Sequence, residues 1–237
     1  MSTPQFELVN SEAHKDIRIN TGKFDIVENK VNAAVVVAGE LSTLIHEYPI
    51  FISKNPETNE FQLIAILGLH SGENLFLQGE VWRAKHLPLD VLRKPFQAFI
   101  PDPKNRAKGS IAIDIDNELV RHDKGELLFT ETGEATEYFK RIEAIFSQLM
   151  GGTMQTATLL QQAADLNLLE EIGLNFDLAD GKQASLNGLF AFNKENVSAL
   201  KGKDLERCHE SGVLQICHLV LSSATHLDKL IKWHADK

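Results

Sequence analysis

The chain has 237 residues, of which 43% are hydrophobic and 24% are charged, so it can bury one sizeable core or two smaller ones. Its formal net charge of −9 argues against nucleic-acid binding, because proteins that bind phosphates usually carry a basic patch. The same charge disfavours an anionic membrane surface as a partner.

The first 130 residues favour strands. Val31–Val37 is a continuous apolar and β-branched run, which is typical of a buried strand. Glu40–Tyr48 has apolar residues at helical spacing, so it predicts a short helix that ends before Pro49. Ile50–Ser53 and Phe61–Leu67 flank a turn-rich tip and predict the clearest hairpin of the chain.

The pattern after this hairpin is less regular. Asn74–Leu77 favours a further strand, and Pro88–Arg93 favours a single helical turn that starts with proline. Phe96–Ile100 and Ser110–Ile115 predict two more strands, because isoleucine alternates with other residues in the second of them.

The second half favours helices. Apolar residues recur at helical spacing over Thr136–Met150 and again over Thr153–Leu169. Two successive glycines, Gly151 and Gly152, lie between these stretches and are expected to separate two helices.

The last part of the chain adds a second hairpin and more helix. Leu174–Leu178 and Leu186–Phe192 flank Asp180-Gly181, a dipeptide that favours a tight turn. Lys194–Leu200 predicts a short helix, and a largely buried final helix is expected from about Asp204 to His234.

Together these elements predict an α+β fold, in which a mainly antiparallel β N-terminal half packs with a helical C-terminal half that contains the second hairpin. We expect a single domain over residues 1–237, with a β-rich subdomain over 1–125 and a helix-rich subdomain over 135–237.

The ends of the chain and its cysteines indicate a location. Met1–Asn10 is polar and acidic, unlike a signal peptide, and no stretch approaches the roughly 18 apolar residues that cross a membrane. Cys208 and Cys217 are about 13 Å apart if they share one straight helix, too far for a disulfide. A cytoplasmic protein with two buried thiols is therefore expected.

No familiar catalytic motif is present. The sequence lacks a glycine-rich dinucleotide turn, a phosphate-binding loop, a GxSxG elbow, HExxH and any CxxC pair, so it predicts no cofactor. None of the nine histidines is three or four residues from another, which is the usual spacing of metal ligands on a helix. Histidines that converge from distant segments remain an alternative.

The most unusual stretch is Gly68–Phe99, which combines glycines, prolines and aromatic residues with scattered charges. One interpretation is a binding surface in which Trp82 is the anchor. In the other, the stretch is an irregular crossover that buries Trp82 and uses Glu73 and Arg93 to satisfy backbone groups. The candidate binding residues are Glu73, Asn74, Trp82, Arg93, Phe96 and, outside the stretch, His46.

His46 is a candidate because it precedes Glu47 and Tyr48, a set of groups suited to acid–base work. The alternative is that His46 only complements the dipole at a helix C-terminus.

Several short elements resemble the bacterial SapC family, and the similarity extends over nearly the whole chain. These elements include the GENLF, Trp82 and RKPF residues of the unusual stretch and the tripeptide Tyr48-Pro49-Ile50. Further matches are Tyr138, Arg141, Ile142, Asp180, Gly181, Leu186, Gly188, Leu189, Phe190, Gly212, Leu214, Ser222 and Leu227. His86 departs from the pattern, because a tyrosine is expected before the proline pair there.

The resemblance implies a cytoplasmic location and supplies no catalytic residues. The unusual stretch Gly68–Phe99 and the absence of catalytic motifs favour a binding or accessory module. Relatives tend to be encoded near cupin-like oxygenases and flavin halogenase-like proteins, which implies such an enzyme as partner. A peptide or a glycan-derived ligand is the other expected partner. Two alternatives stay open, a surface-layer-associated structural protein and a metal-dependent enzyme with convergent histidines.

Overall fold

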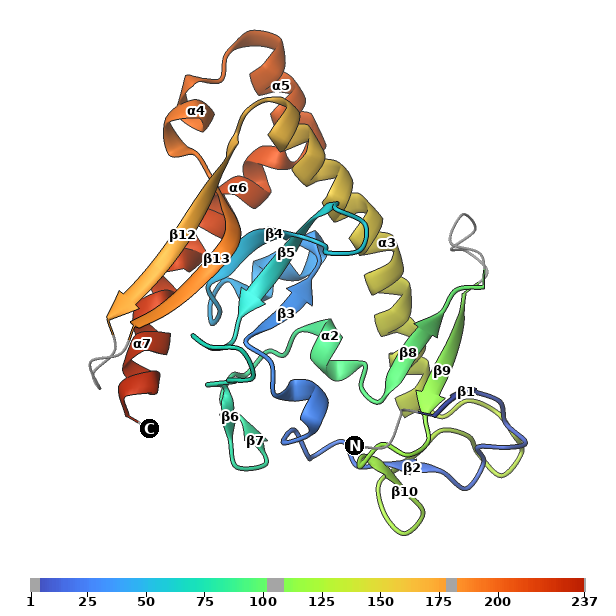
Figure 1. Ribbon diagram of the computed structural model, residues 1–237. Coiled ribbons are helices and arrows are strands. Elements are labelled where there is room, and N and C mark those ends of the chain that lie inside the picture. The colour runs from blue at the N-terminus through green and yellow to red at the C-terminus, as the bar shows by residue number, and fades with distance from the viewer. Residues whose placement is uncertain (1–4, 102–108, 178–182, 237) are drawn as a thin grey trace. The chain divides into compact units, whose positions relative to one another are not determined.

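The computed structural model describes residues 5–101, 109–177 and 183–236 and has an α+β fold (Figure 1). Its sheets are antiparallel and lie mainly in the N-terminal half, while helices dominate the C-terminal half, which confirms the fold class predicted from the sequence. Within the described residues, no helix is both long enough and apolar enough to cross a membrane.

The described strands are β1 (Phe6–Leu8), β2 (Arg18–Ile19), β3 (Ala33–Val36), β4 (Ile50–Lys54), β5 (Phe61–Ile66), β6 (Leu77–Gln78), β7 (Val81–Trp82), β8 (Phe96–Phe99), β9 (Ser110–Asp114), β10 (Val120–Arg121), β11 (Glu126–Leu127), β12 (Leu169–Asp177) and β13 (Gln183–Phe192). The helices are α1 (Leu41–Leu44), α2 (Leu89–Leu92), α3 (Glu137–Asp165), α4 (Lys194–Ala199), α5 (Gly202–Ser211), α6 (Val213–Ser223) and α7 (Leu227–Ala235), with short 3-10 turns η1 (Val27–Asn29), η2 (Ala38–Glu40) and η4 (Ala224–His226).

The described residues form two compact units that alternate along the chain. Unit 1 lies within Met1–Asn29, Leu77–Trp82 and Leu89–Met150, and unit 2 lies within Lys30–Phe76, Arg83–Pro88 and Gly151–Lys237. The expectation that the chain is a single domain stays a prediction.

Unit 1 contains three small antiparallel sheets, with strand orders β1-β9-β8, β10-β2-β11 and β6-β7. Its core joins residues of β2, β8 and β9 to the first half of α3, whose Tyr138, Phe139, Ile142 and Phe146 all lie in one buried cluster. These positions recur at the spacing of a helix face, so the periodicity that predicted the helix also selects the face that packs.

Unit 2 is built on one five-stranded antiparallel sheet with the order β12-β13-β4-β5-β3. The predicted hairpin of β4 and β5 is confirmed, with Ile52 opposite Leu63. The long orange hairpin β12–β13 extends this sheet, because Phe190 pairs with Ile52 of β4 (Figure 1). The Asp180-Gly181 turn lies outside the described residues.

The predicted break at Gly151-Gly152 is wrong, because α3 runs without interruption from Glu137 to Asp165. The physical reason is packing in unit 2. A Cβ atom at position 152 would lie 2.8 Å from Cβ of Val37, whereas nothing lies within 4 Å of one at position 151. Gly152 therefore permits a close approach and does not end the helix.

The prediction of a single final helix from about Asp204 to His234 is also wrong, because this stretch contains α5, α6 and α7. Gly212 has φ of 91°, a left-handed conformation that ends α5 and precedes α6. Cys208 lies in α5 and Cys217 in α6, and both are buried free thiols. Burial raises the pKa of the Cys217 thiol to about 11, so this thiol is unreactive at neutral pH.

A smaller correction concerns Asn74–Leu77, which is not a strand, because pairing starts only at Leu77 in the short β6–β7 ribbon.

The two glycines of α3 give a matched test of this packing. We expect Gly152→Ala to lower the free energy of unfolding by about 1–3 kcal/mol, because the methyl group would overlap Val37. Gly151→Ala should raise it by about 0.5–1 kcal/mol, because alanine favours the helix and has open space there. Urea unfolding measures both, and equal effects of the two substitutions would contradict the close approach.

Candidate functional site

Unit 1 contains a cavity of about 310 Å³, a size found among small-molecule sites. Its walls come from the stretch after β2, from α2 and the residues after it, and from the first turns of α3. The lining residues are Ile19, Asn20, Thr21, Lys23, Phe24, Ile26, Asn29, Val91, Leu92, Lys94, Leu119, Glu126, Tyr138, Arg141, Ile142 and Ile145.

The α3 wall follows from helical spacing. Tyr138, Arg141, Ile142 and Ile145 recur at intervals of three and four residues, so they share one face of the helix. This face is apolar apart from the tyrosine hydroxyl and the guanidinium, which places two polar groups beside an otherwise hydrophobic wall.

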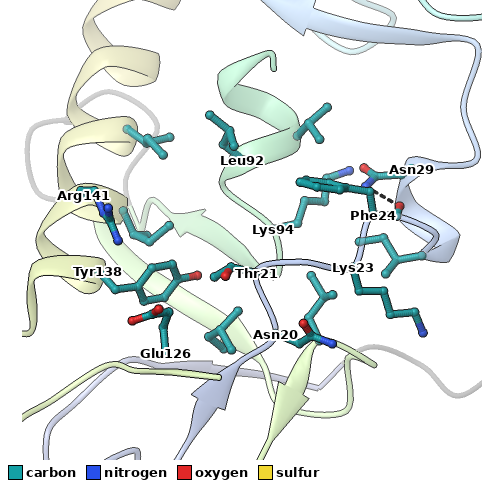
Figure 2. Close-up of a pocket in the computed structure, with 16 residues that line it drawn as sticks. Asn20, Thr21, Lys23, Phe24, Asn29, Leu92, Lys94, Glu126, Tyr138 and Arg141 are labelled. Carbon is teal, nitrogen blue, oxygen red and sulfur yellow. Dashed lines mark hydrogen bonds between the residues drawn. The ribbon is translucent and has the colours of Figure 1, made fainter. Parts of the chain in front are cut away.

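Tyr138 is the polar group that points into the cavity. Its side chain is only 8% exposed, and Figure 2 draws its hydroxyl toward Thr21, with Arg141 on one side of the phenol and Glu126 on the other. Within the described part of the chain, this hydroxyl forms no hydrogen bond. Because this hydroxyl faces the cavity, the cavity offers a hydrogen-bond donor that a ligand can use.

Burial also sets the protonation state of Tyr138. Desolvation raises the pKa of the phenol well above its usual value, the Glu126 carboxylate raises it further, and the Arg141 guanidinium lowers it. The hydroxyl therefore stays protonated at neutral pH, where it can donate a hydrogen bond to a ligand and does not act as a base.

Arg141 and Glu126 are exposed beside this buried phenol. Among the described residues, neither side chain forms an ion pair or a hydrogen bond. Their neighbours are paired elsewhere, since Lys23 pairs with Glu118 and Lys140 with Glu137. The cavity thus carries one positive and one negative charge that are uncommitted.

Lys94 is the third cation of the cavity, and it has a structural partner. Its Nζ donates a hydrogen bond to the carbonyl of Glu28 at 3.0 Å, and burial lowers the pKa of its amine. The ring of Phe24 packs edge-to-face with Trp82 at 6.1 Å, and the Phe24 carbonyl accepts from Asn29 Nδ2 at 3.0 Å (Figure 2). These contacts fix the wall formed by residues 24–29.

The six residues that sequence analysis named as binding candidates do not line this cavity. Unit 2 contains Glu73, Asn74 and His46, whereas unit 1 contains Trp82, Arg93 and Phe96. The structure therefore does not bring the six together in one described unit, and a binding role for them stays a prediction.

In unit 2, Glu73 satisfies polar groups of the fold. Its Oε2 accepts a hydrogen bond from the Leu69 N–H at 2.8 Å, and its Oε1 lies 2.9 Å from His234 Nδ1 on α7. Asn74 is buried and accepts from the Phe76 N–H at 3.0 Å. His46 is exposed in the turn after α1.

In unit 1, Trp82 and Phe96 are core residues that are 6% and 1% exposed. The guanidinium of Arg93 is 2.7 Å from Asp90 Oδ1 and donates to the Phe96 carbonyl at 2.9 Å. Trp82 is thus buried while Glu73 and Arg93 bind backbone groups, the arrangement that the crossover interpretation predicts.

The middle of this crossover is held within unit 2 by the corner between α1 and β4. Glu47 accepts hydrogen bonds from the N–H groups of Lys85 and His86 at 2.8 and 2.9 Å, and the Tyr48 hydroxyl donates to the His86 carbonyl at 2.6 Å. Glu47 and Tyr48 therefore have structural partners, which favours the structural interpretation of this corner over acid–base work.

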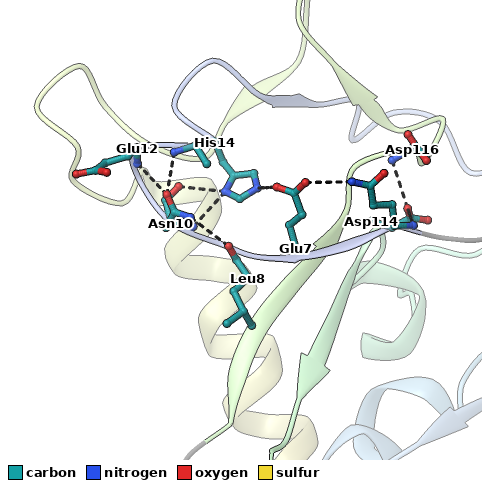
Figure 3. Close-up of polar contacts among 9 residues, drawn as sticks. Glu7, Leu8, Asn10, Glu12, His14, Asp114 and Asp116 are labelled. Carbon is teal, nitrogen blue, oxygen red and sulfur yellow. Dashed lines mark hydrogen bonds and ion pairs between the residues drawn. The ribbon is translucent and has the colours of Figure 1, made fainter.

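A second polar cluster of unit 1 surrounds His14, which is 1% exposed (Figure 3). Its Nδ1 accepts from the Asn10 N–H at 3.1 Å, and its Nε2 is 3.4 Å from Glu7 Oε2 without hydrogen-bond geometry. Asn10 Oδ1 accepts from the N–H groups of Glu12 and Ala13. This cluster organises the turn after β1.

No group of three or more His, Cys, Asp or Glu side chains suited to a metal ion occurs among the described residues.

The geometry defines an α+β protein in which a cavity of unit 1 combines apolar walls with a small set of polar groups, among them the Tyr138 hydroxyl. The chain belongs to the SapC family, whose model matches residues 9–230. No curated protein and no solved structure matches the chain. Membership confirms the resemblance seen in the sequence, where Tyr138, Arg141 and Ile142 already matched without a role.

The contrast between Glu73 and His46 is testable. We expect Glu73→Ala to lower the free energy of unfolding by about 1–3 kcal/mol, because Leu69 and His234 would lose their acceptor. His46→Ala should change it by less than about 0.5 kcal/mol, because this side chain is exposed. Denaturant unfolding of both variants measures the difference, and a neutral Glu73→Ala would refute the structural role.

Proposed function

We propose that this protein is a binding module whose cavity in unit 1 holds a small ligand with an apolar body and at least one polar group. The observation that carries the proposal is Tyr138, a buried residue whose hydroxyl points into the cavity and has no hydrogen-bond partner among the described residues (Figure 2). A ligand acceptor at that position would satisfy this donor.

The composition of the walls supports binding. Ile19, Ile26, Val91, Leu119 and Ile142 supply apolar surface, and a small number of polar groups fix the orientation of a ligand, as is usual for small-molecule sites. Because the pKa of Tyr138 is raised and the amine of Lys94 is held by a backbone carbonyl, these groups favour recognition over proton transfer.

The cytoplasmic location expected from the sequence is part of the proposal. Two buried free thiols are typical of a protein from a reducing compartment.

Filling the cavity tests the proposal. We expect Ile145→Trp to abolish binding of small carboxylates, amines and amino acids in ligand-observed NMR, because Ile145 lines the cavity. Ala144→Trp is the matched control, since the neighbouring Ala144 is exposed and does not line the cavity. The proposal would be refuted if the probes bind both variants equally well. It would also be refuted if no probe binds the parent protein.

A second candidate function is recruitment of a partner enzyme, and an exposed apolar sheet face favours it. Leu8 and Gln97 both pair with Ala112, and Phe99 pairs with Ser110, so they point to the same face of the β1-β9-β8 sheet. Phe6 shares this face, because it is two residues from Leu8. Phe6, Leu8 and Phe99 are 47%, 50% and 49% exposed.

The partner expected from the family resemblance is a cupin-like oxygenase or a flavin halogenase-like protein. We expect affinity capture from the native cells to recover such an enzyme stoichiometrically with the parent protein. The double variant Leu8→Asp, Phe99→Asp should lose it, whereas Val27→Asp, at another exposed apolar position, should retain it. Equal recovery with both variants would exclude this face.

A further inference from the structure

We infer that the ligand of the unit 1 cavity is a free α-amino acid with an apolar side chain, bound as a zwitterion. This inference rests on the proposed function and adds the chemical class of the ligand. It starts from the pair of uncommitted opposite charges, Arg141 and Glu126, that lie on either side of the Tyr138 phenol and line the same cavity (Figure 2).

The two charges both act on Tyr138, since Glu126 raises and Arg141 lowers the pKa of its phenol. Both side chains are exposed and long, so each can turn toward a group that lies at the phenol. A zwitterionic head group satisfies all three at once. Its carboxylate accepts from the Arg141 guanidinium and the Tyr138 hydroxyl, and its ammonium donates to the Glu126 carboxylate.

Ligands with a single charge fit less well. A simple carboxylate would pair with Arg141 but would be repelled by Glu126, and an amine would be repelled by Arg141. A neutral apolar molecule would leave the Tyr138 hydroxyl buried and without a partner. Only a ligand that carries both charges uses every group at this end of the cavity.

The depth of the cavity selects the side chain. Ile19, Val91, Leu119 and Ile142 form apolar walls, and a volume of about 310 Å³ suits one aliphatic or aromatic side chain of ordinary size. The head group lies beside the exposed charges while the side chain enters the apolar part, so the ligand is buried along its hydrophobic end and partly hydrated at the other.

Isothermal titration calorimetry with a matched series of probes tests the inference. L-Leucine and L-phenylalanine should bind, and N-acetyl-L-leucine and 3-methylbutylamine, which each lack one charge, should bind about tenfold more weakly than L-leucine. If N-acetyl-L-leucine or the amine binds as tightly as L-leucine, the zwitterion is refuted while the proposed binding function stands.

Two charge variants locate the contacts. Arg141→Gln should weaken the binding of L-leucine about tenfold without weakening the binding of 3-methylbutylamine. Glu126→Gln should weaken the binding of L-leucine without weakening the binding of N-acetyl-L-leucine. Lys140→Gln, on the same helix but outside the cavity, should bind L-leucine as the parent does. Unchanged L-leucine binding by both cavity variants would overturn the inference. If the probes bind Ile145→Trp as tightly as the parent protein, the proposed function is overturned as well.

Discussion

Packing of the apolar face of α3 against the small sheets of unit 1 is the constraint on which that unit depends. Its three sheets have at most three strands each, and such short strands are not stable alone. Phe139, Ile142 and Phe146 join residues of β2, β8 and β9 in one buried cluster. Because Tyr138 occupies the same face, the packing that stabilises the unit also buries its ring and places its hydroxyl at the cavity.

The candidate site therefore consists of a donor that the fold leaves without a partner and two charges that the fold leaves uncommitted. Tyr138 is the more informative of these residues, because it is buried and its hydroxyl faces the cavity without a partner among the described residues. Arg141 and Glu126 are exposed, where ion pairs contribute little to stability, and the zwitterion proposal assigns them to recognition. The binding proposal and the zwitterion proposal follow from these two different observations.

In unit 2 the polar groups are used differently, because most of them are satisfied within the fold. Glu47 and Tyr48 bind the backbone of residues 85 and 86, and Glu73 binds the backbone of Leu69. The charged and aromatic residues of Gly68–Phe99 thus serve largely to hold an irregular crossover. Successive segments of this crossover belong alternately to unit 2 and unit 1. The unusual composition of Gly68–Phe99 reflects this structural need, because buried backbone amides of an irregular segment require hydrogen-bond partners.

The sequence by itself determined the elements whose signals are local. Alternation and turn residues sufficed for β4, β5, β8 and β9, and helical spacing sufficed for the face of α3 that carries Tyr138. Local patterns were misleading at Gly152 and Gly212, where the first glycine permits contact with Val37 inside a continuous helix and the second ends one. Only the tertiary structure decided that β13 pairs with β4, or that residues such as Ile26, Val91 and Leu119 line one cavity with Tyr138. Contacts between segments so distant in the chain depend on the packing of the whole unit, and no periodicity within one segment records them.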